Sequence, residues 1–136
     1  FIDNVLQAFK QIQSEITNES VEHDFSTRLV DYFIKPVLGY RGNEYAYERG
    51  RTEITLFDEN GFRVVVIETK RPREDLNAEK WREQAGKYAD ESTRFVGLTN
   101  GYRFLLWQVK GGKRELKSDI DFKTLIEGKK LSEEKL

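Results

Sequence analysis

The segment from Arg51 to Lys70, RTEITLFDENGFRVVVIETK, contains two strand-like runs joined by an Asn-Gly pair. A type I′ turn requires positive φ at both central residues, and Asn and Gly adopt this conformation most readily. We therefore expect a β-hairpin whose two loop residues are Asn60 and Gly61. Because the loop of a hairpin sets its register, this turn fixes which residues of the two strands face each other.

The predicted register brings acidic residues together. The first pairs outward from the turn are Glu59 with Phe62 and Asp58 with Arg63. Continued along both strands, the register places Glu53 directly opposite Glu68. Side chains alternate between the two faces of a strand, so Lys70 projects from the same face as Glu68. One face of the hairpin is thus expected to present Glu53, Glu68 and Lys70 together.

Apolar residues on both faces of this hairpin predict that both faces are buried. The alternative is a solvent-exposed hairpin with surface charges, and this composition disfavours it. The apolar residues are Phe57, Val64 and Val66 on the carboxylate face, and Ile54, Leu56, Val65 and Ile67 on the opposite face.

The two opposed carboxylates need a compensating charge. Directly opposed residues have Cβ atoms about 5 Å apart, and carboxylates at that distance repel by roughly 3 kcal/mol at an effective dielectric constant of about 20. A Mg²⁺ ion offsets this repulsion, because it typically binds one or two carboxylates together with waters and phosphate oxygens. Beside such an ion, the Lys70 amine can orient or deprotonate a water, or stabilise charge on a phosphoryl group.

An acid, a hairpin and then Glu68-Thr69-Lys70 form a pattern that resembles the PD-(D/E)xK nuclease motif. Gln84 and Tyr88 match the Gln-x-x-x-Tyr motif that follows the lysine strand in one branch of these nucleases. The run Leu98-Thr99-Asn100-Gly101 is also similar to that branch. Over roughly residues 19 to 125, the chain resembles the nuclease domain at the N-terminus of type I restriction-enzyme R subunits and of related single-chain restriction-modification enzymes.

The resemblance implies a metal-dependent deoxyribonuclease with Mg²⁺ as its cofactor and Mn²⁺ as a substitute. It implies that Glu53 and Glu68 bind the metal, with the Thr69 carbonyl as a third ligand. Lys70 would then act on the attacking water. The family usually has Pro-Asp where this chain has Thr52-Glu53, so the first ligand departs from the family pattern.

The Gln-x-x-x-Tyr pair is expected on a helix that runs to about Ser92. A spacing of four residues places Gln84 and Tyr88 on one helix face, from which both can reach a DNA phosphate or the lysine strand. The alternative is that this face is only the buried apolar side of the helix, formed by Trp81, Ala85, Tyr88 and Ala89.

In the family, an acid from the second helix also reaches the metal site. The spacing to Leu38-Gly39-Tyr40 selects Glu22 for this role, with Glu19 and Asp24 as rivals. An acid in a first helical turn is also favoured by the helix dipole, and that explanation requires no metal.

Five basic residues are candidates for binding the DNA backbone. Some of them surround the Gly111-Gly112 pair, which predicts a second hairpin. For these residues, a solvated charged turn without a DNA-binding role is an equal alternative. The five are Arg71, Arg73, Lys110, Lys113 and Arg114.

Length and charge limit the remaining possibilities. The 136 residues suit one domain, and 23 basic against 24 acidic residues exclude a uniformly basic nucleic-acid binder. The absence of cysteine, of a signal peptide and of a long apolar run predicts a cytoplasmic protein without a membrane span. The chain begins at Phe1 and has no phosphate-binding loop. We therefore expect a fragment of a longer polypeptide.

The order of predicted elements indicates an α/β fold of the restriction-endonuclease-like sandwich type, with a central mixed sheet and helices on both faces. The predicted elements are helices over about residues 1–17, 20–38, 75–92 and 119–127, a strand between 40 and 50, the 51–70 hairpin, and strands over 94–98 and 102–109.

The expected function is a DNA endonuclease domain that cuts double-stranded DNA with little sequence preference, since no segment resembles a base-reading helix. Its expected partners are the motor, methyltransferase and specificity domains or subunits of a restriction-modification enzyme. An exonuclease or recombination nuclease of the same fold is the nearer alternative. A non-catalytic DNA-docking module is the further one, and the intact Glu68-Thr69-Lys70 disfavours it.

Overall fold

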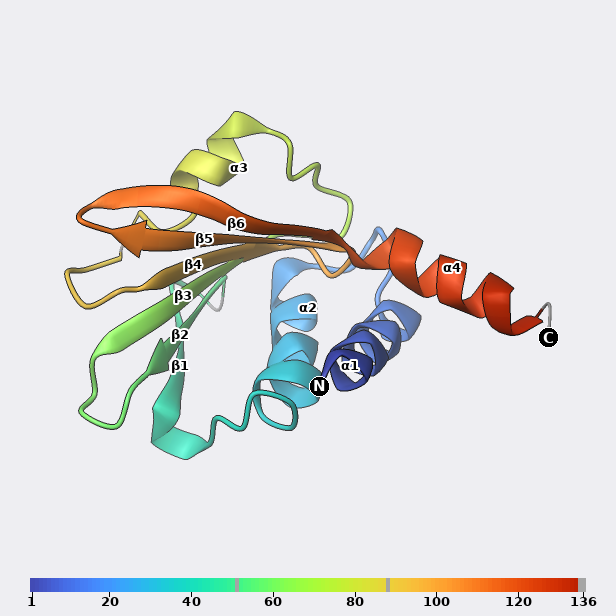
Figure 1. The fold of residues 1–136 in the computed structure, drawn as a ribbon, viewed down its shortest axis with the longest axis horizontal. Coiled ribbons are helices and arrows are strands. Elements are labelled where there is room, and N and C mark those ends of the chain that lie inside the picture. Colours follow the sequence, from blue (N-terminus) through green and yellow to red (C-terminus); the bar gives the residue numbers. More distant parts are fainter. Residues whose placement is uncertain (51, 88, 135–136) are drawn as a thin grey trace.

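The computed structural model describes residues 1–50, 52–87 and 89–134, with the backbone alone for residues 129–134. Its centre is a six-stranded sheet in the order β1-β2-β3-β4-β5-β6 (Figure 1). Strands β3 and β4 are parallel, and every other neighbouring pair is antiparallel. The strands are β1 (Tyr45–Glu48), β2 (Glu53–Phe57), β3 (Arg63–Thr69), β4 (Phe95–Thr99), β5 (Arg103–Lys110) and β6 (Lys113–Asp121).

Helices cover both faces of this mixed sheet, as the sequence predicts. Helices α1 and α2 pack against one face, and the short helix α3 lies on the other (Figure 1). No helix in the described part of the chain is long and apolar enough to cross a membrane. The helices are α1 (Ile2–Glu15), α2 (Glu22–Leu29) with a π-helical continuation η1 (Val30–Ile34), the 3₁₀ turn η2 (Gly42–Glu44), α3 (Glu79–Gln84) and α4 (Phe122–Glu134).

The face under α1 and α2 holds the larger apolar core. Phe9 of α1 is fully buried and stacks on Phe122 of α4 with a centroid distance of 4.0 Å. It also contacts Phe33 at 5.2 Å. The hairpin contributes the four apolar residues predicted for this face, namely Ile54, Leu56, Val65 and Ile67.

The face under α3 holds a smaller apolar cluster beside buried polar residues. The apolar cluster consists of Leu76, Ala85, Val96, Leu98, Leu105 and Trp107. Glu53, Glu68, Thr69 and Lys70 are all buried in the sheet nearby. Because Glu68 pairs with Leu98 of β4, the carboxylates and this second cluster share one face.

The turn of the β2–β3 hairpin differs from the predicted type I′ turn. Gly61 has φ +82°, but Asn60 keeps a negative φ, so that prediction is wrong. The Asp58 side chain organises the loop instead, because its Oδ1 accepts hydrogen bonds from the backbone N–H groups of Asn60 and Phe62 at 2.9 Å. An aspartate that binds the backbone two residues on is a common substitute for a backbone turn.

A β-bulge in the hairpin compensates for the changed turn. The two predicted pairs nearest the loop are wrong, and the observed pairs are Phe57 with Arg63, Leu56 with Val65 and, further out, Glu53 with Glu68. Val64 is the extra residue of the bulge. It restores the predicted register, so the pairing of the two glutamates is confirmed. The bulge also brings Arg63 to the carboxylate face.

Three predicted helices have different boundaries. The second helix begins at Glu22, and its regular α-helical part ends at Leu29. The third was predicted to run to about Ser92 but ends at Gln84, and Asp75 caps a turn before it rather than the helix itself. The last helix begins at Phe122, because the preceding residues form strand β6. This strand confirms the hairpin predicted at Gly111-Gly112, although the predicted order of elements did not include it.

Candidate metal-dependent active site

Three glutamates lie side by side across three strands. Glu48 of β1 pairs with Glu53 of β2, and Glu53 pairs with Glu68 of β3. Directly paired residues project from the same face, with Cβ atoms about 5 Å apart. The sequence predicts the Glu53–Glu68 pair but not Glu48, because nothing local fixes the register of β1.

The middle glutamate is the most deeply buried of the three. Glu53 is 1% exposed, and among the described residues its Oε2 atom has no hydrogen-bond partner. Burial raises the pKa of its carboxyl, and the charges of Glu68 and Glu48 raise that pKa further. A buried carboxylate oxygen without a partner destabilises the fold. It is therefore the feature of this site that most needs an explanation.

The two outer glutamates each contact a cation. Glu48 accepts hydrogen bonds from the Arg63 guanidinium and, at 2.9 Å, from the Thr55 hydroxyl. Arg63 is the main reason why the pKa of Glu48 is lowered. Glu68 forms a salt bridge with Lys70, whose Nζ lies 3.3 Å from its Oε1.

Glu68 and Lys70 are 3% and 4% exposed, so their ion pair is shielded from water. Burial raises the pKa of Glu68, and the nearby Lys70 ammonium opposes that rise. The Lys70 Nζ also donates a hydrogen bond of 2.8 Å to Oε1 of Gln84. The structure thus brings together Glu53, Glu68, Lys70 and Gln84, as the sequence predicts. Tyr88, the other residue of the predicted pair, lies outside the described residues.

Helix α3 presents Gln84 to the lysine strand. With six residues it is too short to be stable alone, so its position depends on contacts with its neighbours. Arg114 of β6 donates hydrogen bonds of 2.6 Å to the carbonyl groups of Arg82 and Ala85 at the end of α3. The Arg114 guanidinium also lies 4.7 Å from the centroid of the Trp107 ring.

A second α3 residue contacts Lys70. The Lys70 Nζ lies 4.1 Å from the centroid of the Trp81 ring. The sequence offered Trp81 only as part of a buried apolar helix face. Its spacing of three residues from Gln84 was the available signal, because residues three apart share one face of a helix.

Backbone contacts hold the end of β3. Thr69 donates to the Thr52 carbonyl through its N–H at 2.8 Å and through its hydroxyl at 3.0 Å. The Lys70 N–H donates to the Thr99 carbonyl at 2.9 Å. Asn100, in the Leu98–Gly101 run, donates from Nδ2 to the Glu74 carbonyl at 2.9 Å. These contacts tie the segment after Lys70 to the β4–β5 turn.

The structure distinguishes among the three acids considered for the second helix. Glu22 is half-buried at the start of α2, and its charge contributes to raising the pKa of Glu68. Glu19 and Asp24, by contrast, are exposed. The structure therefore favours Glu22 as the α2 acid nearest the carboxylates.

The five candidate DNA-binding residues lie toward two ends of the sheet. Arg71 and Arg73 are exposed beside Lys70 at one end of the sheet. Lys110 and Lys113 pair with each other at the β5–β6 turn. This turn is at the opposite end of β5, roughly 20 Å away at about 3.3 Å per residue. The fifth residue, Arg114, is held by the carbonyl groups of α3.

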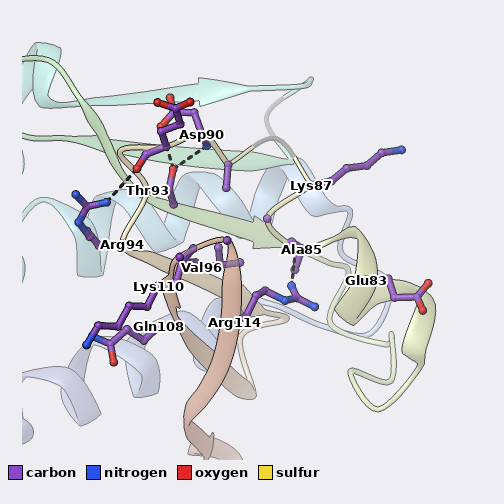
Figure 2. A pocket seen from close by; sticks show the side chains of 16 residues that line it. Glu83, Ala85, Lys87, Asp90, Thr93, Arg94, Val96, Gln108, Lys110 and Arg114 are labelled. Carbon is purple, nitrogen blue, oxygen red and sulfur yellow. Dashed lines mark hydrogen bonds between the residues drawn. The ribbon is translucent and has the colours of Figure 1, made fainter.

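A cavity of about 1080 Å³ lies between the α3–β4 connection and the β5–β6 turn. Figure 2 shows Arg114 in it, hydrogen-bonded to Ala85. None of the three glutamates lines this cavity, so it is separate from the carboxylate row. Its walls contain both signs of charge, from Lys87, Arg94, Lys110 and Arg114 and from Glu83, Asp90 and Glu91.

The carboxylate row fits a hard divalent cation of the Mg²⁺ type. Among the described residues, no three His, Cys, Asp or Glu side chains are grouped to enclose a metal. Mg²⁺ needs only one or two carboxylates, because waters and phosphate oxygens complete its coordination. Glu53 and Glu68 can supply two carboxylates, and the Glu53 Oε2 atom, which has no hydrogen-bond partner in the described segments, can act as a ligand.

Comparison with known proteins adds no relative, because no family model, no curated protein and no solved structure matches this chain.

Proposed function

We propose that this chain is a Mg²⁺-dependent DNA endonuclease domain. The observation that most supports the proposal is the buried Oε2 atom of Glu53, which has no hydrogen-bond partner in the described part of the chain. Glu53 lies in register with Glu68, which in turn forms a salt bridge with Lys70. Burying this carboxylate destabilises the metal-free fold, and a bound cation would offset that cost.

Each residue of the site has a distinct role in this proposal. Glu53 and Glu68 hold the cation with the Thr69 carbonyl, and Glu22 contributes an outer contact. When bound, Mg²⁺ supplies Lewis-acid activation of water and neutralises charge on the phosphate. Lys70 orients the attacking water and stabilises charge that develops on the phosphoryl oxygens.

The reaction is hydrolysis of a phosphodiester. The water oxygen forms a new bond to phosphorus, the bond from phosphorus to a sugar oxygen breaks, and a proton from the water ends on that leaving oxygen. Gln84 accepts a hydrogen bond from Lys70 and so holds the amine in place during these changes. No redox partner is needed.

The proposed substrate is double-stranded DNA, bound through its phosphate backbone. Arg71 and Arg73 are the cations closest along the chain to Lys70, and both are exposed. Phosphate contacts position a duplex without reading its sequence. Site selection is therefore assigned to the other domains or subunits of a restriction-modification enzyme.

The test is cleavage of a closed circular plasmid, which has no ends for an exonuclease. Wild-type domain should nick or linearise the plasmid with Mg²⁺ or Mn²⁺ but not with chelator. Glu53→Gln should be inactive, and Lys113→Met, which lies at the far turn, should still cut. Degradation of linear DNA alone would instead support an exonuclease of the same fold. Equal cutting with metal and with chelator would refute the metal mechanism.

A further inference from the structure

Lys70 is held by three different groups. Its Nζ donates to Gln84 Oε1 at 2.8 Å, lies 3.3 Å from Glu68 Oε1, and lies 4.1 Å from the centroid of the Trp81 ring. The glutamate and the glutamine belong to the site described above. The indole has no assigned role there, although it is as close to the amine as cation–π contacts require.

The Trp81 ring is fixed by packing. It lies against the apolar cluster under α3, and the end of α3 is held by Arg114. Residues three apart share one helix face, so Trp81 and Gln84 approach Lys70 from the same element. The indole therefore provides a fixed surface beside the long and otherwise flexible Lys70 side chain.

An aromatic ring holds an ammonium group differently from a third oxygen acceptor. An ammonium has three N–H donors, and an additional acceptor would occupy one of them. The aromatic face instead attracts the cation through its quadrupole, and this attraction is stronger in a site that excludes water. Lys70 can thus be held in place while a donor remains for water or phosphate.

We propose that Trp81 is a positioning residue that acts through Lys70. This inference rests on the proposed nuclease function, because it assigns a second support to the amine of the same site. Trp81 itself need not touch DNA or metal. Its contribution is the location of the Lys70 ammonium relative to the two carboxylates.

Lys80 provides a matched control. Its Nζ lies 4.5 Å from the centroid of the same Trp81 ring, but its side chain is exposed. Replacing Lys80 therefore removes one of the two ammonium groups near the indole and keeps the other, Lys70, which belongs to the site. Lys80→Met should leave cleavage and Mg²⁺ dependence unchanged, whereas loss of the ring should not.

The first experiment measures single-turnover plasmid cleavage against Mg²⁺ concentration for wild type, Trp81→Leu, Trp81→Phe, Lys80→Met and Lys70→Ala. We expect Trp81→Leu to slow cleavage about tenfold with the Mg²⁺ midpoint unchanged. Trp81→Phe should recover most of the rate, because a smaller ring still attracts the cation.

The second experiment needs no activity. In chelator, a double-mutant cycle of denaturant unfolding with Trp81→Leu and Lys70→Met measures the coupling between ring and amine. We expect a coupling of roughly tenfold in the unfolding equilibrium constant. The equivalent cycle with Lys80→Met should show little coupling, because that amine is exposed.

The outcomes separate this inference from the proposed function. If wild type does not cut with any divalent metal, the proposed function fails, and the positioning role fails with it. If wild type cuts and Lys70→Ala does not, but Trp81→Leu cuts as fast as Lys80→Met, only the role of Trp81 is refuted. Additive effects of Trp81→Leu and Lys70→Met on unfolding would also refute it.

Discussion

The two faces of the hairpin formed by β2 and β3 are both buried, but they bury opposite kinds of side chain. On the α1 and α2 face, Ile54 and Ile67 are paired and packed under aromatic rings. One residue away on each strand, Glu53 and Glu68 are paired on the α3 face and are equally buried. The first face stabilises the fold by removing apolar surface from water. The second opposes it, because two carboxylates are buried within repelling distance.

We interpret this difference as a division between a face that stabilises the fold and a face that would carry the proposed chemistry. The apolar face needs only side chains of suitable size, and many combinations would serve. The carboxylate face needs particular groups. Arg63 and Lys70 balance the two outer glutamates, while one oxygen of the middle glutamate has no hydrogen-bond partner among the residues that the structure describes. Removing a buried ring from the apolar face and removing the Glu53 charge from the carboxylate face should therefore change stability in opposite directions.

The largest effect is expected on the apolar face. Phe9→Ala removes a fully buried ring that contacts Phe33, Phe104 and Phe122. We expect it to lower the free energy of unfolding by about 3 to 5 kcal/mol. Denaturant titration measures this, and Mg²⁺ affinity of the remaining folded protein should be unchanged. A loss below about 1 kcal/mol would mean that this face is not the main source of stability.

The opposite sign is expected for Glu53→Gln on the carboxylate face. Without metal, this variant should be as stable as wild type or more stable, by up to about 3 kcal/mol, because a buried charge and its repulsion are removed. Cleavage should be lost at the same time. Thermal melts in chelator and plasmid assays measure the two effects.

Glu48→Gln is the control for that substitution, because Glu48 belongs to the same row but binds Arg63. Losing this half-buried ion pair should lower stability by about 1 to 2 kcal/mol. A Glu53→Gln protein that is as destabilised as Glu48→Gln would mean that Glu53 has a structural partner.

A smaller effect of about 1 to 2 kcal/mol is expected for Arg114→Met, which leaves two α3 carbonyl groups without their charged donor. Cleavage should fall because α3 supports Lys70, while affinity for DNA should stay unchanged. Lys113→Met, one residue away and exposed, should leave stability unchanged. Chemical denaturation and DNA-binding titrations distinguish the two. If Arg114→Met lost DNA affinity but not stability, the DNA-binding role predicted from the sequence would be restored.

The pH dependence provides the most gradual test of the carboxylate face. The raised pKa values of Glu53 and Glu68 mean that the folded metal-free state binds protons more tightly than the unfolded state. The stabilisation that comes from this tighter proton binding is fully present below the ordinary carboxyl pKa, about 4.3. It is lost as the pH rises through the raised pKa values.

Carboxyls with lowered pKa, such as Glu48 and Asp90, act in the opposite direction as pH falls. The useful quantity is therefore the difference between wild type and Glu53→Gln. Denaturant melts in chelator at several pH values should show wild type losing stability relative to Glu53→Gln as pH rises. The slope should be at most about 1.4 kcal/mol per pH unit for each proton. A flat difference would show that Glu53 does not titrate in this range.

The sequence predicted the features that depend on alternation within a strand. The pairing of Glu53 with Glu68 was correct although the turn was not, because the bulge at Val64 cancelled the changed loop. Local residues set both deviations, but Asp58 and Asn60 favour more than one turn, and hydrophobic pattern alone does not locate a bulge.

The features that were missed depend on packing between distant segments. Helix α3 was predicted too long because apolar spacing continues past Gln84. At Gly86 the backbone has φ +76°, and an added Cβ would lie 2.7 Å from Val96. The contact of Arg114 with α3 likewise joins segments far apart in the chain. The sequence predicted a hairpin at Gly111-Gly112 but not that its second strand would bind α3. Such long-range constraints leave no periodic signal.

The most direct test of the central claim is calorimetric titration of Mg²⁺ into three proteins: wild type, Glu53→Gln and Glu48→Gln. The two glutamates differ in that Glu48 is bound to Arg63, whereas the Glu53 Oε2 atom has no hydrogen-bond partner within residues 1–50, 52–87 and 89–134. We predict that wild type and Glu48→Gln bind Mg²⁺ with similar affinity and that Glu53→Gln shows no measurable binding. Equal binding by all three proteins, or no binding by wild type, would contradict a metal site at the Glu53–Glu68 pair.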